Sequence, residues 1–231
     1  MYSAIRRQYS RKREEWHSRR LEFFLDVMRP RAGTSVLDLG GSDGEFMHRM
    51  RKHVDVEVTV ADISETALEH ARERGFSTVT LREGEPLPFR DGEFDIVFCN
   101  SVIEHATVPK KDCAERTFTN EEWVALSIGH QQEFARELRR IARNYFVQTP
   151  HVAFPLESHT WLPFVGWLSH DATVRLVRIT DRVWAKHCGY VDWHLLGERV
   201  MKYLFPEAHL HVERVLGLPK SLIAYFAGQS C

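Results

Sequence analysis

VLDLGGSDGEF, residues 36–46, is the stretch of sequence that decides the fold. An apolar run ends in Asp38, and three glycines, Gly40, Gly41 and Gly44, follow closely. Glycine lets the backbone turn sharply and approach a ligand closely. In open α/β sheets, ligands bind at the carboxyl ends of the strands, where a strand passes through such a loop into a helix. The stretch therefore predicts a ligand site at the end of the first strand of an α/β sheet.

The sequence around this loop alternates between short apolar runs and amphipathic segments. Strands are predicted at 35–40, 56–63, 77–81, 94–100 and 144–150, and helices at 44–54, 64–75 and 120–142. Ser64 is the expected N-cap of the second of these helices, and Gly75 the residue that closes it. This order predicts a doubly wound, mostly parallel sheet with helices on both faces. Residues 211–227 predict two antiparallel strands joined at GLPK, a hairpin at the sheet edge.

The acids in the glycine loop distinguish it from two common nucleotide-binding patterns. The dinucleotide fingerprint G-x-G-x-x-G fits neither register, because its third position is Ser42 from the first glycine and Asp43 from the next. The Walker pattern fails as well, since no Gly-Lys-Ser/Thr follows. Asp38, Asp43 and Glu45 would repel a phosphate at this helix N-terminus. The loop therefore favours a ligand with a positive charge.

Three motifs in order resemble those of the class I S-adenosylmethionine-dependent methyltransferases, in particular the small-molecule, type 11-like members. The first is VLDLGGSDGEF, similar to an acid-x-Gly-x-Gly-x-Gly loop with Ser42 in place of the middle glycine. The second is VTVADIS, residues 58–64, in which an acid ends strand two. The third is REGEPLPFRDGEFDIVFCNSVIEHA, residues 82–106. The resemblance covers residues 35–106 and implies a Rossmann-like fold with S-adenosyl-L-methionine as cofactor.

The resemblance also implies which residues bind the cofactor: Asp38, Gly40, Gly41, Gly44, Asp62, Ile63, Glu83, Gly84, Asn100 and Ser101. The three glycines of the loop would line its amino-acid moiety, with Asp38 close to the ammonium group. Asp62 would accept hydrogen bonds from both ribose hydroxyls, since a carboxylate is an acceptor only. Ile63 would pack on the adenine. Glu83, where the family usually has Asp, and the backbone N–H of Gly84 would contact the adenine. Asn100 and Ser101 would lie beside the sulfonium.

Histidines are the candidates for a general base, because their pKa lies near neutral pH. Three of the 13 follow predicted strands closely or lie in the segment after them: His105, His151 and His159. For each of them a purely structural role is the alternative.

The segment HVAFPLESHTWLPFVGWLSH, residues 151–170, is unusually rich in aromatic residues, proline and histidine. Such an insert after strand five is expected to line the acceptor site, with Glu157, Trp161 and Trp167 as substrate contacts. A packed surface loop is the alternative. No metal is expected, because the spacing H-x5-E-x-H in this segment matches no standard metal-binding pattern.

Composition excludes several classes of protein. The 231 residues carry a formal net charge of −1, whereas proteins built mainly to hold nucleic acid usually show a basic imbalance. No run reaches the roughly 18 apolar residues of a membrane span, and the N-terminus lacks the apolar region of a secretory signal. The four cysteines are scattered without a CxxC pair, which favours reduced thiols in a cytoplasmic protein.

A single domain over residues 1–231 is expected, with three segments around the cofactor site. Residues 1–30 form a helical lid that ends at Pro30. The seven Lys and Arg residues of its first 20 positions either form a solvated face or meet an anionic substrate or cofactor. Residues 107–133 look irregular and polar and are expected to form a mobile lid. Residues 151–205 form the substrate-binding insert.

The sequence thus predicts methyl transfer from S-adenosylmethionine to an oxygen or nitrogen of a small-molecule acceptor, in specialised or cell-envelope metabolism. In-line displacement with positioning, assisted by a histidine base, is the expected mechanism. The aromatic insert favours a moderately apolar or sugar-like acceptor. The alternatives are an RNA or protein methyltransferase, supported only by the basic N-terminus, and a non-catalytic partner. A monomer or homodimer is expected, without nucleic-acid or membrane partners.

Overall fold

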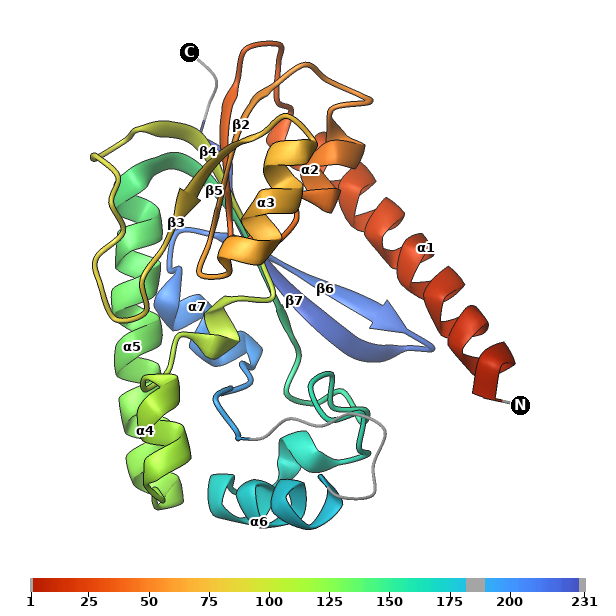
Figure 1. Cartoon of the computed structure of the whole chain (residues 1–231), viewed down its shortest axis with the longest axis vertical. Helices are drawn as coiled ribbons and strands as arrows, with labels where there is room; N and C mark the ends of the chain where they lie inside the picture. The colour runs from red at the N-terminus through yellow and green to blue at the C-terminus, as the bar shows by residue number, and fades with distance from the viewer. Residues whose placement is uncertain (1, 182–189, 229–231) are drawn as a thin grey trace.

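The computed structural model describes residues 2–181 and 190–228 and shows one seven-stranded sheet with helices on both faces (Figure 1). The strands lie in the order β3-β2-β1-β4-β5-β7-β6. The first five are parallel, β7 runs antiparallel to β5, and β6 pairs with β7 at the edge. Their bounds are β1 Ser35–Leu39, β2 Glu57–Asp62, β3 Ser77–Thr80, β4 Phe94–Asn100, β5 Ala142–Pro150, β6 His209–Val215 and β7 Leu218–Phe226. The predicted Rossmann-like sheet with an antiparallel C-terminal hairpin is confirmed.

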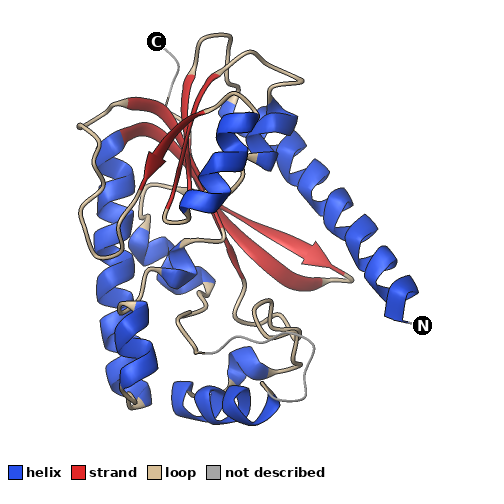
Figure 2. Ribbon diagram, viewed as in Figure 1, coloured by secondary structure: helices blue, strands red, loops and turns tan. Residues whose placement is uncertain are grey.

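Helices cover both faces of this sheet (Figure 2), and each face carries a buried apolar core. The helices are α1 Tyr2–Met28, α2 Glu45–Met50, α3 Glu65–Glu73, α4 Lys110–Glu115, α5 Asn120–Ile141, α6 His170–Thr180 and α7 Glu198–Leu204, with short 3₁₀ turns η1 Ile103–His105 and η2 Val165–Trp167. Helices α1, α2 and α3 pack their apolar residues on one face, and α5 and α7 on the other. Strand β4 is buried on both faces, as its continuous apolar run predicts.

Local sequence signals begin and end α3 and α5 close to where they were expected, whereas α2, predicted to residue 54, ends at Met50. The Ser64 hydroxyl accepts a hydrogen bond from the Ala67 N–H at 3.3 Å and so caps α3. Gly75 has a φ of +79° just beyond the C-terminus of α3, a conformation that glycine adopts without steric cost. The Thr119 hydroxyl accepts from the Glu122 N–H in the same way and begins α5.

Helix α1, Tyr2–Met28, lies within the helical segment predicted over residues 1–30, and its last turns belong to the core. Leu21, Phe24 and Met28 are buried against the sheet at helical spacing, and the Phe24 ring packs edge-on against that of Phe98 in β4. The helix ends before Pro30, as expected, because proline disfavours a helical conformation in the residue before it. The last turns of α1 are therefore fixed to the sheet, and Arg20 reaches Asn100 at the end of β4 and Gln148 in β5.

The two predicted insert segments carry regular structure. Residues 107–133, expected to be irregular, contain α4 and the first turns of α5, because Val108, Phe118 and Trp123 bury a small apolar cluster of their own. Their mobility stays a prediction. Residues 151–205 contain η2, α6 and α7 in their described parts.

The structure bears on the state of the cysteines and on membrane-spanning helices only within the described residues. Cys99 and Cys113 are free thiols, while Cys188 and Cys231 lie outside the described residues. Among the helices that the structure describes, none combines the length and apolar character that crossing a membrane requires.

Candidate functional site

The glycine loop between β1 and α2 has no room for side chains at its turn. Gly40 has a φ of +71°, and a Cβ atom there would lie 2.2 Å from Cγ2 of Val102. A Cβ at Gly41 would lie 2.4 Å from Oδ2 of Asp38. The loop is thereby held tightly against the end of β1 and the segment after β4. Its backbone can approach a ligand as the opening motif predicts.

Asp38 has a buried carboxyl group, one oxygen of which makes no hydrogen bond to the described residues. Its side chain is 2% exposed, and Oδ2 has no hydrogen-bond partner among the described residues. Burial raises the pKa of Asp38 to about 8, with smaller contributions from the nearby carboxylates of Asp62 and Asp43. A cation placed here would satisfy the oxygen and lower that pKa. The site thus fits the ammonium group of the expected cofactor.

Asp62 ends β2 and braces the loop. Its Oδ2 accepts from the Ser42 N–H and its Oδ1 from the Ser64 N–H, each at 2.9 Å. Each carboxylate oxygen has a second lone pair that remains available to a diol. The adjacent Ile63 is 50% exposed and offers an apolar surface beside the carboxylate. These positions fit the ribose and adenine roles that the resemblance assigns.

Glu83 and Gly84 lie on the loop after β3. Oε1 of Glu83 accepts from the Lys110 N–H at 3.3 Å, which links this loop to the start of α4. Gly84 has a φ of +79°. The adenine contact predicted for the pair remains a prediction, and α4 is the element that would border it.

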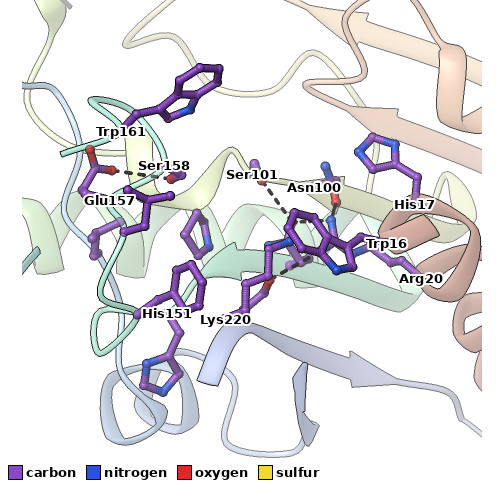
Figure 3. Close-up of a pocket in the computed structure, with 16 residues that line it drawn as sticks. Trp16, His17, Arg20, Asn100, Ser101, His151, Glu157, Ser158, Trp161 and Lys220 are labelled. Carbon is purple, nitrogen blue, oxygen red and sulfur yellow. Dashed lines mark hydrogen bonds between the residues drawn. The ribbon is translucent and has the colours of Figure 1, made fainter. Parts of the chain in front are cut away.

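A cavity of about 310 Å³ opens at the carboxyl ends of β4 and β5 (Figure 3). Asn100 and Ser101 line it from the end of β4, and Glu157 and Trp161 from the insert. A volume of this order suits a small ligand. The structure therefore brings two residues predicted beside the sulfonium together with two predicted substrate contacts. Trp167 does not line the cavity and is 57% exposed, packed against the Phe164 ring instead.

Helix α1 covers this cavity through a buried polar network. The Arg20 guanidinium donates from Nη1 to Oδ1 of Asn100 at 2.6 Å and to Oε1 of Gln148 at 3.0 Å. It also forms a two-pronged ion pair with Glu213 of β6. The Ser101 hydroxyl donates to the same Gln148 oxygen at 3.0 Å. These bonds tie α1, β4, β5 and the C-terminal hairpin together around the cavity.

Lys220 supplies a positive charge inside the cavity. Its Nζ lies 3.6 Å from the centroid of the Trp16 ring, a cation–π contact between β7 and α1. Figure 3 shows both side chains beside those of Asn100 and Arg20. Burial lowers the pKa of Lys220 to about 8, and the nearby Arg20 lowers it further, partly opposed by Glu213. The cavity thus joins a cation to apolar and aromatic walls.

Of the three predicted histidines, one lines the cavity and two do not. His151 lines the cavity, and its Nδ1 accepts from the Ala153 N–H at 2.9 Å. Burial lowers the pKa of His151. His105 and His159 meet each other instead, with their Nε2 atoms 3.1 Å apart.

Carboxylates surround the His105–His159 pair. Nδ1 of His105 lies 3.2 Å from Oδ1 of Asp192, and Nδ1 of His159 lies 2.5 Å from Oε1 of Glu157. Burial alone would lower the pKa of His105, but its hydrogen bond to Asp192 and the nearby Glu104 raise it above its ordinary value. The imidazole of His159 and backbone hydrogen bonds hold the pKa of Glu157 at about 2, against the effect of burial. The pair is therefore strongly oriented.

Several site residues carry no local signal in the sequence. Trp16, Arg20 and Lys220 reach the cavity from the two ends of the chain, and Asp192 reaches His105 from within the insert. Only the basic character of the first 20 residues pointed to α1, as a segment that meets the substrate. No spacing links Asp192 or Lys220 to the motifs, since the fold alone brings them there.

The sequence of this chain is similar to a known protein family and to a protein from an archaeon. Residues 36–120 match the family model described as a methyltransferase domain. Uncharacterized protein MJ1123 of Methanocaldococcus jannaschii is 37% identical over 151 residues, which are 64% of this chain and 71% of that protein.

Two further similarities are more limited. The 27-O-demethylrifamycin SV methyltransferase of Amycolatopsis mediterranei is 30% identical over 99 residues, and the match spans 40% of this chain and only 36% of that protein. The crystal structure of an S-adenosylmethionine-dependent methyltransferase from Mesorhizobium loti superposes with a TM-score of 0.56 at 17% identity, covering 87% of this chain and 94% of that one. The structural similarity supports the fold.

Proposed function

Because the chain belongs to the class I S-adenosylmethionine-dependent methyltransferases, we propose that it methylates an oxygen or nitrogen of a small molecule bound in the 310 Å³ cavity. The observation that carries the proposal is the position of Asn100 and Ser101. Asn100 ends β4 and Ser101 follows it directly, and both line the cavity. An acceptor in the cavity would therefore lie next to the methyl group of the cofactor.

The walls of the cavity favour a moderately apolar acceptor with an acidic hydroxyl or a similar group. Phe154, Leu156 and Trp161 supply apolar surface, and Lys220 supplies the positive charge. With a pKa of about 8, Lys220 is close to the range in which a lysine can pair with an ionised oxygen or take up its proton. His151, which lines the same cavity, is the proposed residue that contacts the acceptor. The similarity to a 27-O-demethylrifamycin SV methyltransferase supports a small-molecule acceptor.

Positioning is the main contribution that we assign to the protein. S-adenosylmethionine, when bound, supplies a methyl group that is already activated on a sulfonium. Asp38, Asp62 and the three loop glycines would hold it, and the cavity would orient the acceptor in line. Holding two reactants in a reactive geometry can contribute about 7–11 kcal/mol to lowering the barrier. Helix α1, fastened over the cavity by Arg20, would exclude water.

Calorimetric titration tests the proposal at its first step. S-adenosylmethionine and its demethylated product should both bind the purified protein with micromolar affinity. The variant Asp62→Ala should lose this binding, because it removes the acceptors that face the ribose. Glu69→Ala, on the exposed surface of α3, is the matched control and should bind as the wild type does. Circular dichroism confirms that each variant is folded.

Two outcomes of this titration would contradict the proposal. If folded wild-type protein binds neither compound, the non-catalytic alternative replaces it. If Asp62→Ala binds as well as Glu69→Ala does, the cofactor site lies elsewhere. Once binding is established, acceptor screens with apolar phenols and hydroxylated small molecules against an RNA and a protein pool would distinguish the acceptor classes.

A further inference from the structure

The contact between His105 and His159 needs a chemical explanation. Each ring points its Nδ1 at a carboxylate, Asp192 in one case and Glu157 in the other, and its Nε2 at the other ring. A carboxylate only accepts hydrogen bonds, so each ring donates from Nδ1. A neutral imidazole with its hydrogen on Nδ1 carries a lone pair on Nε2. Two lone pairs therefore face each other across 3.1 Å, an arrangement that is stable only with a positive centre between them.

Glu104 adds a third ligand atom beside the two rings. Its side chain is completely buried, and its Oε2 accepts from the Thr149 hydroxyl at 3.0 Å. Its Oε1 has no hydrogen-bond partner in the described part of the chain. One ligand atom each from Glu104, His105 and His159 lies within 4.8 Å of the others. A buried, unpartnered carboxylate oxygen is costly unless a cation or a donor satisfies it.

We propose that Glu104, His105 and His159 bind a divalent transition-metal ion, with Zn²⁺ as the best match, and leave one coordination position open. Two imidazoles and a carboxylate with an open fourth position are an established ligand set for zinc. Tetrahedral zinc with Zn–N bonds of about 2.05 Å places two nitrogen ligands about 3.3 Å apart. The observed 3.1 Å between the Nε2 atoms is close to that value. Imidazole ligands favour Zn²⁺, Co²⁺ or Fe²⁺ over Mg²⁺ and Ca²⁺.

The surroundings of the two rings match those of metal-binding histidines. Such a histidine usually donates its other ring N–H to a carboxylate, which fixes the orientation of the ring. Asp192 and Glu157 are placed to accept from His105 and His159 in this way. His105 is 33% exposed, which gives an ion a path of entry from solvent. The spacing of His151, Glu157 and His159 along the sequence predicted no metal, whereas the proposed ligands combine η1 with the insert.

The role of the ion, which rests on the proposed function, is to position the wall of the acceptor cavity. His105 belongs to η1, directly after β4, and His159 belongs to the insert. A metal ion bound by both would join the two segments. Glu157, which holds the His159 ring, itself lines the cavity. The ion would thus fix the insert against the cofactor-binding half of the protein.

Titration of the full chain with Co²⁺ after removal of metal by a chelator tests the site directly. The wild type should bind one equivalent and develop the visible absorption of four-coordinate Co²⁺, and Zn²⁺ should displace it. His159→Ala should weaken binding at least about 100-fold, and Asp192→Asn about 10–100-fold. Glu104→Gln, which keeps the shape of the side chain, should weaken it at least about tenfold and serves if His159→Ala does not fold. His70→Ala, an exposed histidine of α3, is the control and should bind as the wild type does.

The outcomes separate the metal site from the proposed function, because S-adenosylmethionine binding is measured on the same samples. Wild type that binds the cofactor but no Co²⁺ overturns the metal site alone, and a shared proton then explains the facing rings. Co²⁺ binding that survives both His159→Ala and Glu104→Gln also overturns it. Co²⁺ binding that is lost in these variants, together with no cofactor binding by the wild type, supports the site and contradicts the proposed function.

Discussion

Arg20 donates a hydrogen bond to Asn100 at 2.6 Å, although 80 residues separate them in the sequence. The same guanidinium pairs with Glu213, and the two side chains are only 6% and 19% exposed. The end of β4, where the proposed cofactor and acceptor sites meet, is thereby tied to the first helix and to the last hairpin. Helix α1 is part of the site as well as part of the core.

Removing the charge of Arg20 should destabilise the protein strongly. Arg20→Met leaves Glu213 buried without its partner, and breaking a buried pair in this way costs about 3–5 kcal/mol. Urea unfolding measures the change in the free energy of unfolding. Arg19→Met, one residue earlier and exposed, should change it by less than about 0.5 kcal/mol. Arg20→Met combined with Glu213→Leu should recover much of the loss, and equal effects at positions 19 and 20 would refute the buried pair.

Asp38 should make the unliganded protein less stable as pH rises. Its folded pKa of about 8 lies above the 3.8 of an unperturbed aspartate, so between these values the folded state holds a proton that the unfolded state has released. The free energy of unfolding therefore falls through this window. Asp38→Asn removes the effect, and thermal unfolding at pH 5 and pH 8 should show a smaller loss than in the wild type. Asp55→Asn, on the surface, should lose as much stability between pH 5 and pH 8 as the wild type does. If Asp38→Asn loses as much stability between pH 5 and pH 8 as the wild type does, the raised pKa of Asp38 is contradicted.

Gly40 should tolerate no side chain. In Gly40→Ala the new Cβ would lie 2.2 Å from Val102 in a left-handed backbone conformation. Gly33 has a similar φ of +80°, but nothing lies within 4 Å of its Cβ position. Gly33→Ala should therefore cost only the conformational strain of about 1–2 kcal/mol. Gly40→Ala should cost clearly more and abolish cofactor binding, as measured by urea unfolding and calorimetry. Equal losses in the two variants would show that the loop can move away from Val102.

Replacing Ser42 by glycine should stabilise the protein. It adopts a φ of +51° at the position where the resembling family has its middle glycine, and left-handed backbone is unfavourable for serine. Ser42→Gly should raise the free energy of unfolding by about 0.5–1 kcal/mol, the strain relieved less the added freedom of the unfolded chain. Ser77→Gly, in strand β3, should lower it by a similar amount. A loss in Ser42→Gly would mean that the serine side chain makes a contribution of its own.

Residues 107–119 should exchange their amide hydrogens faster than the buried turns of α5. Val108 and Phe118 of this segment pack with Trp123 of α5, the Thr107 hydroxyl donates to the Asp192 carbonyl at 2.7 Å, and the Lys110 N–H donates to Glu83. Hydrogen exchange with mass spectrometry should show protection rising when S-adenosylmethionine is added. Full protection without a ligand would contradict the predicted lid.

The sequence was sufficient for the strands, loop and helix cap around the predicted cofactor site because its signals there are local. A strand, a glycine loop and a capping serine are recognised within a few residues, and the acids at 38 and 62 occupy defined places relative to them. The parallel order of β1, β2 and β4 then brings these places to one edge of the sheet. The bounds of β4 and the cap of α3 agree with the structure for the same reason.

The acceptor side was decided by tertiary structure, because its contacts join residues that lie far apart in the chain. Arg20 meets Glu213 across 193 positions, and His105 meets His159 across 54. Side-chain patterns reveal which face of an element is buried, but they do not reveal which distant partner it will meet. The sequence alone determined the cofactor loop and the order of the sheet, which depend on local backbone geometry. Only the folded chain determined the walls of the cavity and the meeting of Glu104, His105 and His159, since packing across the sheet edge sets those distances.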